Sequence, residues 1–423
     1  MNTTTSIKKI NVYLLPIAAF FILISTAVTN LFLILTVFTA FLICIKNNNF
    51  DEIYKKDFFF KICFLIFLLF VISSFYTIAE PSEILSTLKK YVKIIYIPFV
   101  FFYLKTYRNE KLVINFFIYG TTLILFLSYI KFLNTFFFEN FYESVKFLNI
   151  SGIKQNIIVT KSTVFQNYII QGIVFSFYSF LCFFMATKKH SLLLYFLSFL
   201  AFFNVIFMND SRTAYIIIFI LFIFSFFKII NTTKIRILFV SFLVLISVLG
   251  FSSNSQISNN FEYRINMINS NLENIQEGNY NNSLGMRYMW FKIGLDNFMN
   301  EPILGYGIGS FYKSTEDYFK NNNIINFYTD KNNNSEPISE NNLLTNNPHS
   351  EIISISSQLG IIGLLTFSIF LYLILFNYAG PMSFATFIIV FVSSLFNSVF
   401  YDNMIGLFII IIISLFYKNK AKI

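Results

Sequence analysis

Long apolar runs separated by short polar connections alternate along most of the chain. A helix needs about 17–25 apolar residues to cross a bilayer, and twelve windows approach or reach this length. They cover 11–28, 29–45, 60–79, 93–104, 112–130, 167–187, 191–208, 213–228, 236–252, 352–376, 382–400 and 404–417. Lipid offers no partner to backbone N–H and C=O groups, so each run is expected to be helical. The pattern predicts an all-α polytopic membrane protein with about twelve transmembrane helices.

The basic residues set the orientation of these spans. Counted from a cytoplasmic N-terminus, 17 of the 31 Lys and Arg residues fall in segments on one side, as the positive-inside rule expects of the cytoplasmic face. Both chain ends are therefore predicted to be cytoplasmic. The chain divides into spans one to nine (1–252), a large outer loop (253–351) and spans ten to twelve (352–423).

Composition agrees with this class of protein. Hydrophobic residues make up 56% of the 423 residues and charged residues only 12%, whereas a soluble chain has about 25% charged residues. Basic loops beside spans account for the net charge of +10, so no nucleic-acid partner is expected. All three cysteines fall in apolar runs, which indicates core or lipid-facing residues rather than a disulfide framework or metal cluster. They are Cys44, Cys63 and Cys182.

The outer loop differs between its two halves. Its second half is rich in Asn, which is typical of a flexible or variable loop. In its first half, four apolar side chains share one face of a predicted helix that Pro302 ends. They are Tyr288, Phe291, Leu295 and Phe298. We interpret this face as packing against the membrane domain rather than forming a substrate groove. The glycines of 305–309 predict a tight turn, and without a βαβ unit they are no dinucleotide fingerprint.

His349 stands where the outer loop meets the tenth predicted span. Asn347 suits a helix N-cap and Pro348 suits the first helical position, which would place His349 in the first turn. The helix dipole there disfavours imidazolium. An imidazole with an ordinary pKa near ~6.5 would then be neutral and able to accept a proton. The alternative is an interfacial residue that only begins a helix, and the residues alone favour neither. The other histidine, His190, is interpreted as an ordinary loop residue.

Arginines gather on the same predicted face. Arg212 follows Asp210 and Ser211, either of which could cap the next helix, and an arginine in a first helical turn can bind phosphate. The alternative is an interfacial arginine paired with Asp210. Arg264 and Arg287 lie in the outer loop, where each could be a solvated charge. Three lysines also fall outside, where they could meet lipid headgroups or an anionic substrate. They are Lys89, Lys90 and Lys93.

Three motifs in order carry a resemblance to a known family. His349-Ser350, nine residues and then Gly360-x-x-Gly363 resembles the histidine signature of the bacterial O-antigen ligase family. That family includes O-antigen polymerases and protein O-oligosaccharyltransferases. "SRTA" before a span and "RYMW" followed by "EPILGYGIGSF" precede the signature, in the order of that family. The motifs cover roughly residues 205–376.

The resemblance implies a GT-C-like glycosyltransferase at the periplasmic face of the bacterial inner membrane. Such enzymes move a glycan from undecaprenyl pyrophosphate to an acceptor sugar hydroxyl, here expected on lipid A-core, with no metal or other cofactor. It implies that His349 is the general base. Arg212 and Arg287, with Arg264 as a further candidate, would bind the pyrophosphate and stabilise its charge. The implied partners are the lipid-linked glycan, the acceptor and membrane lipids.

Ligases, polymerases and protein oligosaccharyltransferases share these motifs. We favour a ligase because the spacing from His349 to Gly363 resembles the ligases most closely. A membrane transporter is the alternative from another class, and it would be expected to hold ionisable groups within its spans and to repeat its halves. Here the charges gather at span ends and one outer loop is far longer than the rest, which favours an enzyme.

Overall fold

The computed structural model describes residues 11–47, 57–137, 162–229, 269–276, 283–322, 344–376 and 380–417, together with residues 266 and 280. All regular structure within these ranges is helical, which confirms the all-α prediction. Four helices in the described ranges are long and apolar enough to cross a membrane: Thr26–Asn47, Glu110–Leu133, Tyr168–Lys189 and Glu351–Phe376. Five shorter apolar helices accompany them. The ninth predicted span, 236–252, lies outside the described residues, and the count of twelve stays a prediction.

Nine helices precede the outer loop in the described part of the chain. They are α2 (Leu14–Phe20), α3 (Thr26–Asn47), α5 (Phe58–Ser73), α6 (Pro81–Tyr91), α7 (Lys93–Tyr107), α8 (Glu110–Phe137), α9 (Tyr168–Lys189), α10 (Leu192–Phe203) and α11 (Arg212–Phe224). A 3-10 turn (Phe21–Leu23) follows α2, and π-helical turns (Asn204–Met208 and Ser225–Ile229) extend α10 and α11. The outer loop contributes α14 (Ser283–Asn300) and α15 (Phe311–Asn321). The chain continues with α16 (Glu351–Phe376), α17 (Pro381–Phe396) and α18 (Asn403–Phe416).

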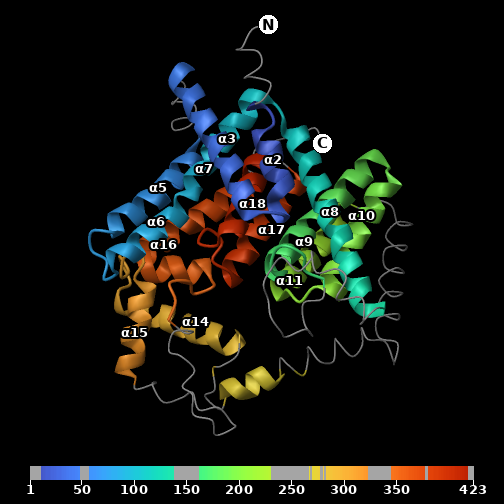
Figure 1. Cartoon of the computed structure of the whole chain (residues 1–423). Helices are drawn as coiled ribbons and strands as arrows, with labels where there is room; N and C mark the ends of the chain where they lie inside the picture. Colours follow the sequence, from blue (N-terminus) through green and yellow to red (C-terminus); the bar gives the residue numbers. More distant parts are fainter. Residues whose placement is uncertain are drawn as a thin grey trace.

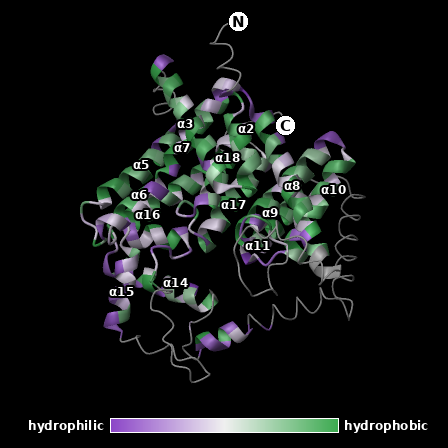
Figure 2. Cartoon of the chain, in the orientation of Figure 1, coloured by the Kyte–Doolittle hydropathy of each residue, from purple (hydrophilic) through white to green (hydrophobic). Residues whose placement is uncertain are grey.

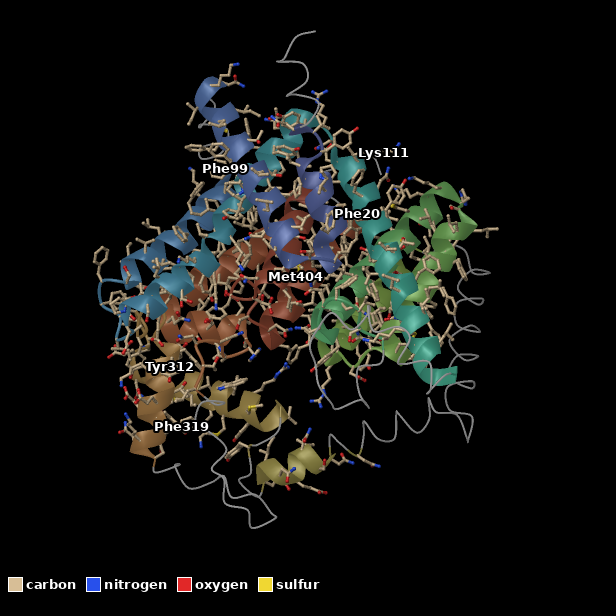
Figure 3. The ribbon with its side chains drawn as sticks, in the orientation of Figure 1. Phe20, Phe99, Lys111, Tyr312, Phe319 and Met404 are labelled. Carbon is tan, nitrogen blue, oxygen red and sulfur yellow. The ribbon has the colours of Figure 1, made fainter. Side chains whose placement is uncertain are left out.

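The core lies around α9 and α18, which the other helices enclose (Figure 1). Every residue of α18 from Met404 to Phe416 is buried, and Met404 lies among side chains at the centre of the bundle (Figure 3). A helix enclosed in this way needs no lipid-facing surface, which suits its uniformly apolar sequence. The three cysteines are buried in α3, α5 and α9, so of the two predicted alternatives, core or lipid-facing, the structure supports core residues.

The loop helices α14 and α15 lie at one end of the bundle, at the bottom of the view, and α3 reaches the opposite end (Figure 1). Apolar residues dominate the long helices, whereas polar residues gather at helix ends and over α15 (Figure 2). At the far end, the Tyr417 hydroxyl donates to Asp57 Oδ1, and the Tyr103 hydroxyl donates to the Asn11 carbonyl. The first and last described segments therefore meet the ends of other helices at the far end, away from α14.

Helix α14 matches the predicted helix but presents a different face to the bundle. Tyr288, Phe291 and Leu295 are 45%, 50% and 42% exposed, so the prediction that their face packs against the membrane domain is wrong. The buried face instead carries Met289, Trp290, Ile293 and Asn297. Gly294 lies on this side, and a Cβ there would overlap the Ile353 side chain of α16. The absence of a side chain lets the two helices approach closely.

Helix α16 is broken at Gly360, where φ is 59° and ψ is −153°. In a continuous helix the Ile361 N–H would donate to the Ser357 carbonyl. Here it donates to the Pro302 carbonyl (2.8 Å). The freed carbonyl groups of Ser357 and Gln358 accept from the N–H groups of Tyr306 (3.0 Å) and Gly307 (2.9 Å). The break is thus filled by backbone from the outer loop.

The segment that fills the break, residues 304–309, is termed the glycine turn. Its three glycines have φ values of 67°, 86° and 75°, which confirms the predicted tight turn and explains the residue type. The Gly309 N–H donates to Gln358 Oε1 (2.8 Å), and the Ile308 N–H donates to Ser73 Oγ (3.2 Å). Thr77 Oγ1 donates to the Ile308 carbonyl (2.7 Å). The glycine turn therefore joins α16 to the end of α5.

Candidate active site at the start of helix α16

His349 lies just before α16 rather than in its first turn. Asn347 Oδ1 accepts a hydrogen bond from the His349 N–H (3.0 Å), which forms an Asx turn. Ser350 Oγ accepts from the Ile353 N–H (3.4 Å), which makes Ser350 the N-cap. The prediction that Asn347 caps this helix is therefore wrong, because its side chain closes an earlier turn.

The backbone of His349 adopts the left-handed conformation, with φ of 51°. Among the described residues other than glycine, only Arg108 and His190 share this feature. Both of those residues end helices, α7 and α9, where a left-handed residue is common. His349 instead precedes a helix. Strained backbone at such positions occurs preferentially at functional sites.

Trp290 of α14 holds the imidazole ring from one side. The two ring centroids are 5.0 Å apart with an interplanar angle of 31°. Trp290 is 6% exposed and forms a small apolar cluster with Ile293, Phe311 and Ile353. The cluster joins α14 and α15 to the first turn of α16. It thereby fixes the position of α14 over His349.

Charge and burial keep the imidazole neutral. Burial first, and the nearby Arg287 charge second, lower the pKa of His349 from 6.5 to about 4. His349 is therefore neutral at pH 7, as the sequence predicts, but the causes are burial and the Arg287 charge rather than the helix dipole. The pKa of Arg287 is itself lowered, chiefly by burial and also by Arg212, while Tyr168 opposes this effect. Arg212, Arg287 and His349 are therefore electrostatic neighbours.

Arg212 lies where the start of α11 meets the end of α17 and the start of α16. Ser211 Oγ accepts from the Ala214 N–H (3.2 Å), so Ser211 is the cap, as one of the two predicted candidates. Asn397, just after α17, donates from Nδ2 to Thr213 Oγ1 (3.3 Å). Its carbonyl accepts from the Glu351 N–H (3.1 Å). The starts of α11 and α16 are thus tied to the same residue, and Arg212 is exposed beside them.

The lysines of α6 and α7 have different environments. Lys93 is 4% exposed and donates to the Asp402 carbonyl (3.0 Å) and Asn403 Oδ1 (3.2 Å), so it meets neither headgroups nor substrate, in contrast to the prediction. Lys90 Nζ lies 3.4 Å from the centroid of the Tyr401 ring. Lys89 is exposed. Arg264 lies outside the described residues.

Sequence reasoning missed three residues of this site. Tyr168 is the first residue of α9 and lies near enough to Arg287 to raise the pKa of that guanidinium. The sequence gives no signal of this proximity. Glu351 is fully buried, and its Oε2 accepts from the Phe400 N–H (3.1 Å). Trp290 did carry a signal, because it is the only tryptophan in the chain.

The fold and the site define a helical membrane protein with a charged site where several of its spans begin. Residues 196–368 match the sequence profile of the O-antigen ligase family. The match confirms the resemblance drawn from the motifs and includes Arg212, Arg287 and His349. Enzymes of this family transfer glycans, with lipid-linked glycans as their substrates in general. The chain has no match among curated proteins.

Proposed function

We propose that the protein is an O-antigen ligase. It would move a glycan from undecaprenyl pyrophosphate to a sugar hydroxyl of lipid A-core at the periplasmic face of the inner membrane. The observation that supports the proposal most is the convergence of Arg212, Arg287 and His349. These residues come from α11, α14 and the segment before α16, and charge couples each to the next.

The reaction exchanges one glycosidic bond for another. The acceptor oxygen attacks the anomeric carbon of the glycan, and the bond from that carbon to the pyrophosphate breaks. His349 accepts the hydroxyl proton, and undecaprenyl pyrophosphate departs with the electron pair. A positioned general base contributes about 10²–10⁴ in rate. A bound pyrophosphate would raise the pKa of His349 from about 4, because a nearby negative charge stabilises imidazolium. The donor would thus make the base stronger.

The two arginines have complementary roles toward the leaving group. Arg287 is half-buried, so its charge acts in a medium that screens it less than water does. Arg212 is exposed at the first turn of α11, where backbone N–H groups and the guanidinium can bind phosphate oxygens together. Negative charge grows on the pyrophosphate as the bond breaks, and both residues stabilise it.

The test of the base compares the two histidines of the chain. His349→Ala should remain folded and inserted but lose about 10²–10⁴ of its glycan-transfer rate. His190→Ala, at an exposed residue that ends α9, is the matched control and should be fully active. Near-normal turnover in His349→Ala would exclude the general-base role. Loss of donor binding would instead make His349 a ligand of the pyrophosphate.

Polymerase and protein O-oligosaccharyltransferase activities remain candidates from the same family, and a membrane transporter is the candidate from another class. A glycan profile of a deletion strain separates these functions. Loss of all long chains from lipid A-core supports a ligase, and caps of a single repeat indicate a polymerase. Unchanged lipopolysaccharide with altered glycoproteins indicates protein glycosylation. Lipid-linked glycan that stays on the cytoplasmic side indicates transport.

A further inference from the structure

A cavity of about 350 Å³ lies between α9, α10 and α11. Six phenylalanines dominate its wall, and it is termed the aromatic cavity. They are Phe180, Phe183, Phe196, Phe199, Phe202 and Phe222. Four serines also line it, but each of their hydroxyls already donates to a backbone carbonyl within these helices. Its lining contains no charged residue, so the aromatic cavity suits an uncharged, apolar guest.

The aromatic cavity lies deeper along two helices that begin at the charged site. Its α11 lining runs from Ile218 to Ser225. At about 1.5 Å of rise per residue, these positions lie about 9–20 Å beyond Arg212. Its α9 lining, from Ser176 to Phe183, lies about 12–22 Å beyond Tyr168 on the same measure. A lipid whose headgroup is held at the site would therefore pass its chain at the depth of this cavity.

We infer that the aromatic cavity holds part of the polyprenyl chain of the donor, in the isoprene units that follow the first two from the pyrophosphate. The inference rests on the proposed function. Positive charge at Arg212 matches the pyrophosphate, while the aromatic wall matches an apolar chain, and one molecule carries both groups at this separation. Phe196 lines the cavity and is 52% exposed, so the cavity wall is open to the surroundings of the protein at this side chain.

The cavity acts chiefly through position. Lipid tails are as apolar as the cavity wall, so moving a chain from bilayer to cavity gains little from the hydrophobic effect. A branched chain seated between phenyl rings does, however, fix the height of its pyrophosphate relative to Arg212 and His349. Correct placement of reacting atoms strongly affects rate. The occupied cavity should therefore raise kcat/KM for donors whose chain is long enough to reach it.

Photocross-linking tests occupancy directly. A benzoylphenylalanine replaces Phe222 in the cavity or, as control, Phe219, which lies on the same helix and is 63% exposed. The probe is radiolabelled undecaprenyl pyrophosphate added to purified protein in phosphatidylglycerol nanodiscs. We expect at least tenfold more labelling at position 222, competed by unlabelled undecaprenyl pyrophosphate. Equal labelling at both positions, or labelling of position 222 that unlabelled undecaprenyl pyrophosphate does not compete, would overturn the inference.

Donor chain length gives a second, kinetic test. Ile218→Trp places an indole in the cavity wall, and Ser225→Leu adds less bulk at another point. Both should lower kcat/KM for an undecaprenyl donor, by about tenfold or more for the tryptophan, and leave transfer from a two-isoprene donor unchanged. Equal loss with both donors in both variants, or no loss, would overturn the inference. Failure of wild-type protein to transfer from either donor would refute the proposed function instead.

Discussion

Replacing Arg287 with glutamine should raise the pKa of His349 and move the acid limb of the pH–activity profile upward. In the wild type, burial and the Arg287 charge lower this pKa from 6.5 to about 4. Only the neutral imidazole accepts a proton, so wild-type activity should persist through pH 5 and fall as pH drops through that pKa. Without the neighbouring charge imidazolium is less costly, and the loss should begin at higher pH.

The size of the effect can be bounded. The depression from 6.5 to about 4 corresponds to about 3.4 kcal/mol, at 1.36 kcal/mol for each tenfold change in proton affinity. Burial is the larger of the two causes and persists in the variant. Arg287 therefore supplies less than half of this free energy, below ~1.7 kcal/mol. The protonation constant should thus rise by about two- to twentyfold.

The measurement is kcat/KM between pH 4 and 8, because this parameter reports the pKa values of the free enzyme. Labelled imidazole carbons offer an independent NMR titration, since the chain has only two histidines and exposed His190 serves as the reference. Arg212→Gln removes the same charge from a residue that borders Arg287, so it should lower kcat/KM without moving the limb. A limb that stays in place in Arg287→Gln, or moves equally in both variants, would refute this reasoning.

Three further predictions concern the site, the fold and the topology. Arg212→Lys keeps its charge but loses the two-pronged donor, so most glycan transfer should be lost; full activity at normal protein levels would reduce Arg212 to a surface charge. Gly360→Ala should lower the free energy of unfolding by about 1–3 kcal/mol because of the left-handed backbone at this position, and the melting temperature should fall. Gly380 has open space around it, so Gly380→Ala should leave the melting temperature unchanged. Equal melting temperatures of the two variants would contradict the role of Gly360. For the topology, Met299→Cys and Leu192→Cys are made in a cysteine-free background, since both residues are exposed. Met299→Cys should react with an impermeant maleimide in spheroplasts, and Leu192→Cys should react only after lysis. The reverse pattern would contradict a periplasmic site.

Hydrophobic runs predict much of this fold because span-length helices need little beyond local apolar sequence. Helices α9 and α16 nearly coincide with the predicted windows 167–187 and 352–376. Helix α5 ends at Ser73, six residues before the end of its predicted window, 60–79. Hydropathy cannot locate that end, because contacts with the distant glycine turn accompany it: Ser73 Oγ accepts from the Ile308 N–H, and Thr77 Oγ1 donates to the Ile308 carbonyl.

The site shows a similar division. Motif spacing predicts Arg212, Arg287 and His349 as site residues. The fold brings these three residues together although they are far apart in sequence. Local capping rules misplace His349, because an Asn side chain can close an Asx turn as readily as cap a helix. The pattern of large apolar residues also selects the wrong face of α14. The contact there depends on Gly294, a residue that hydrophobic periodicity does not count.

The break in α16 limits how this protein could be recombined with its relatives. A chimera that takes α16 from a protein of the O-antigen ligase family and keeps residues 304–309 from this chain would join a foreign helix to a turn that is not matched to it. In this chain the carbonyl groups at positions 357 and 358 accept from the N–H groups of Tyr306 and Gly307. A turn that does not fit the foreign helix would leave the carbonyl groups at these positions unpaired where water is scarce, at several kcal/mol for each group. The smallest exchangeable unit should therefore extend from α14 through α16. Crossover points inside it should yield degraded protein even when all three site residues are retained.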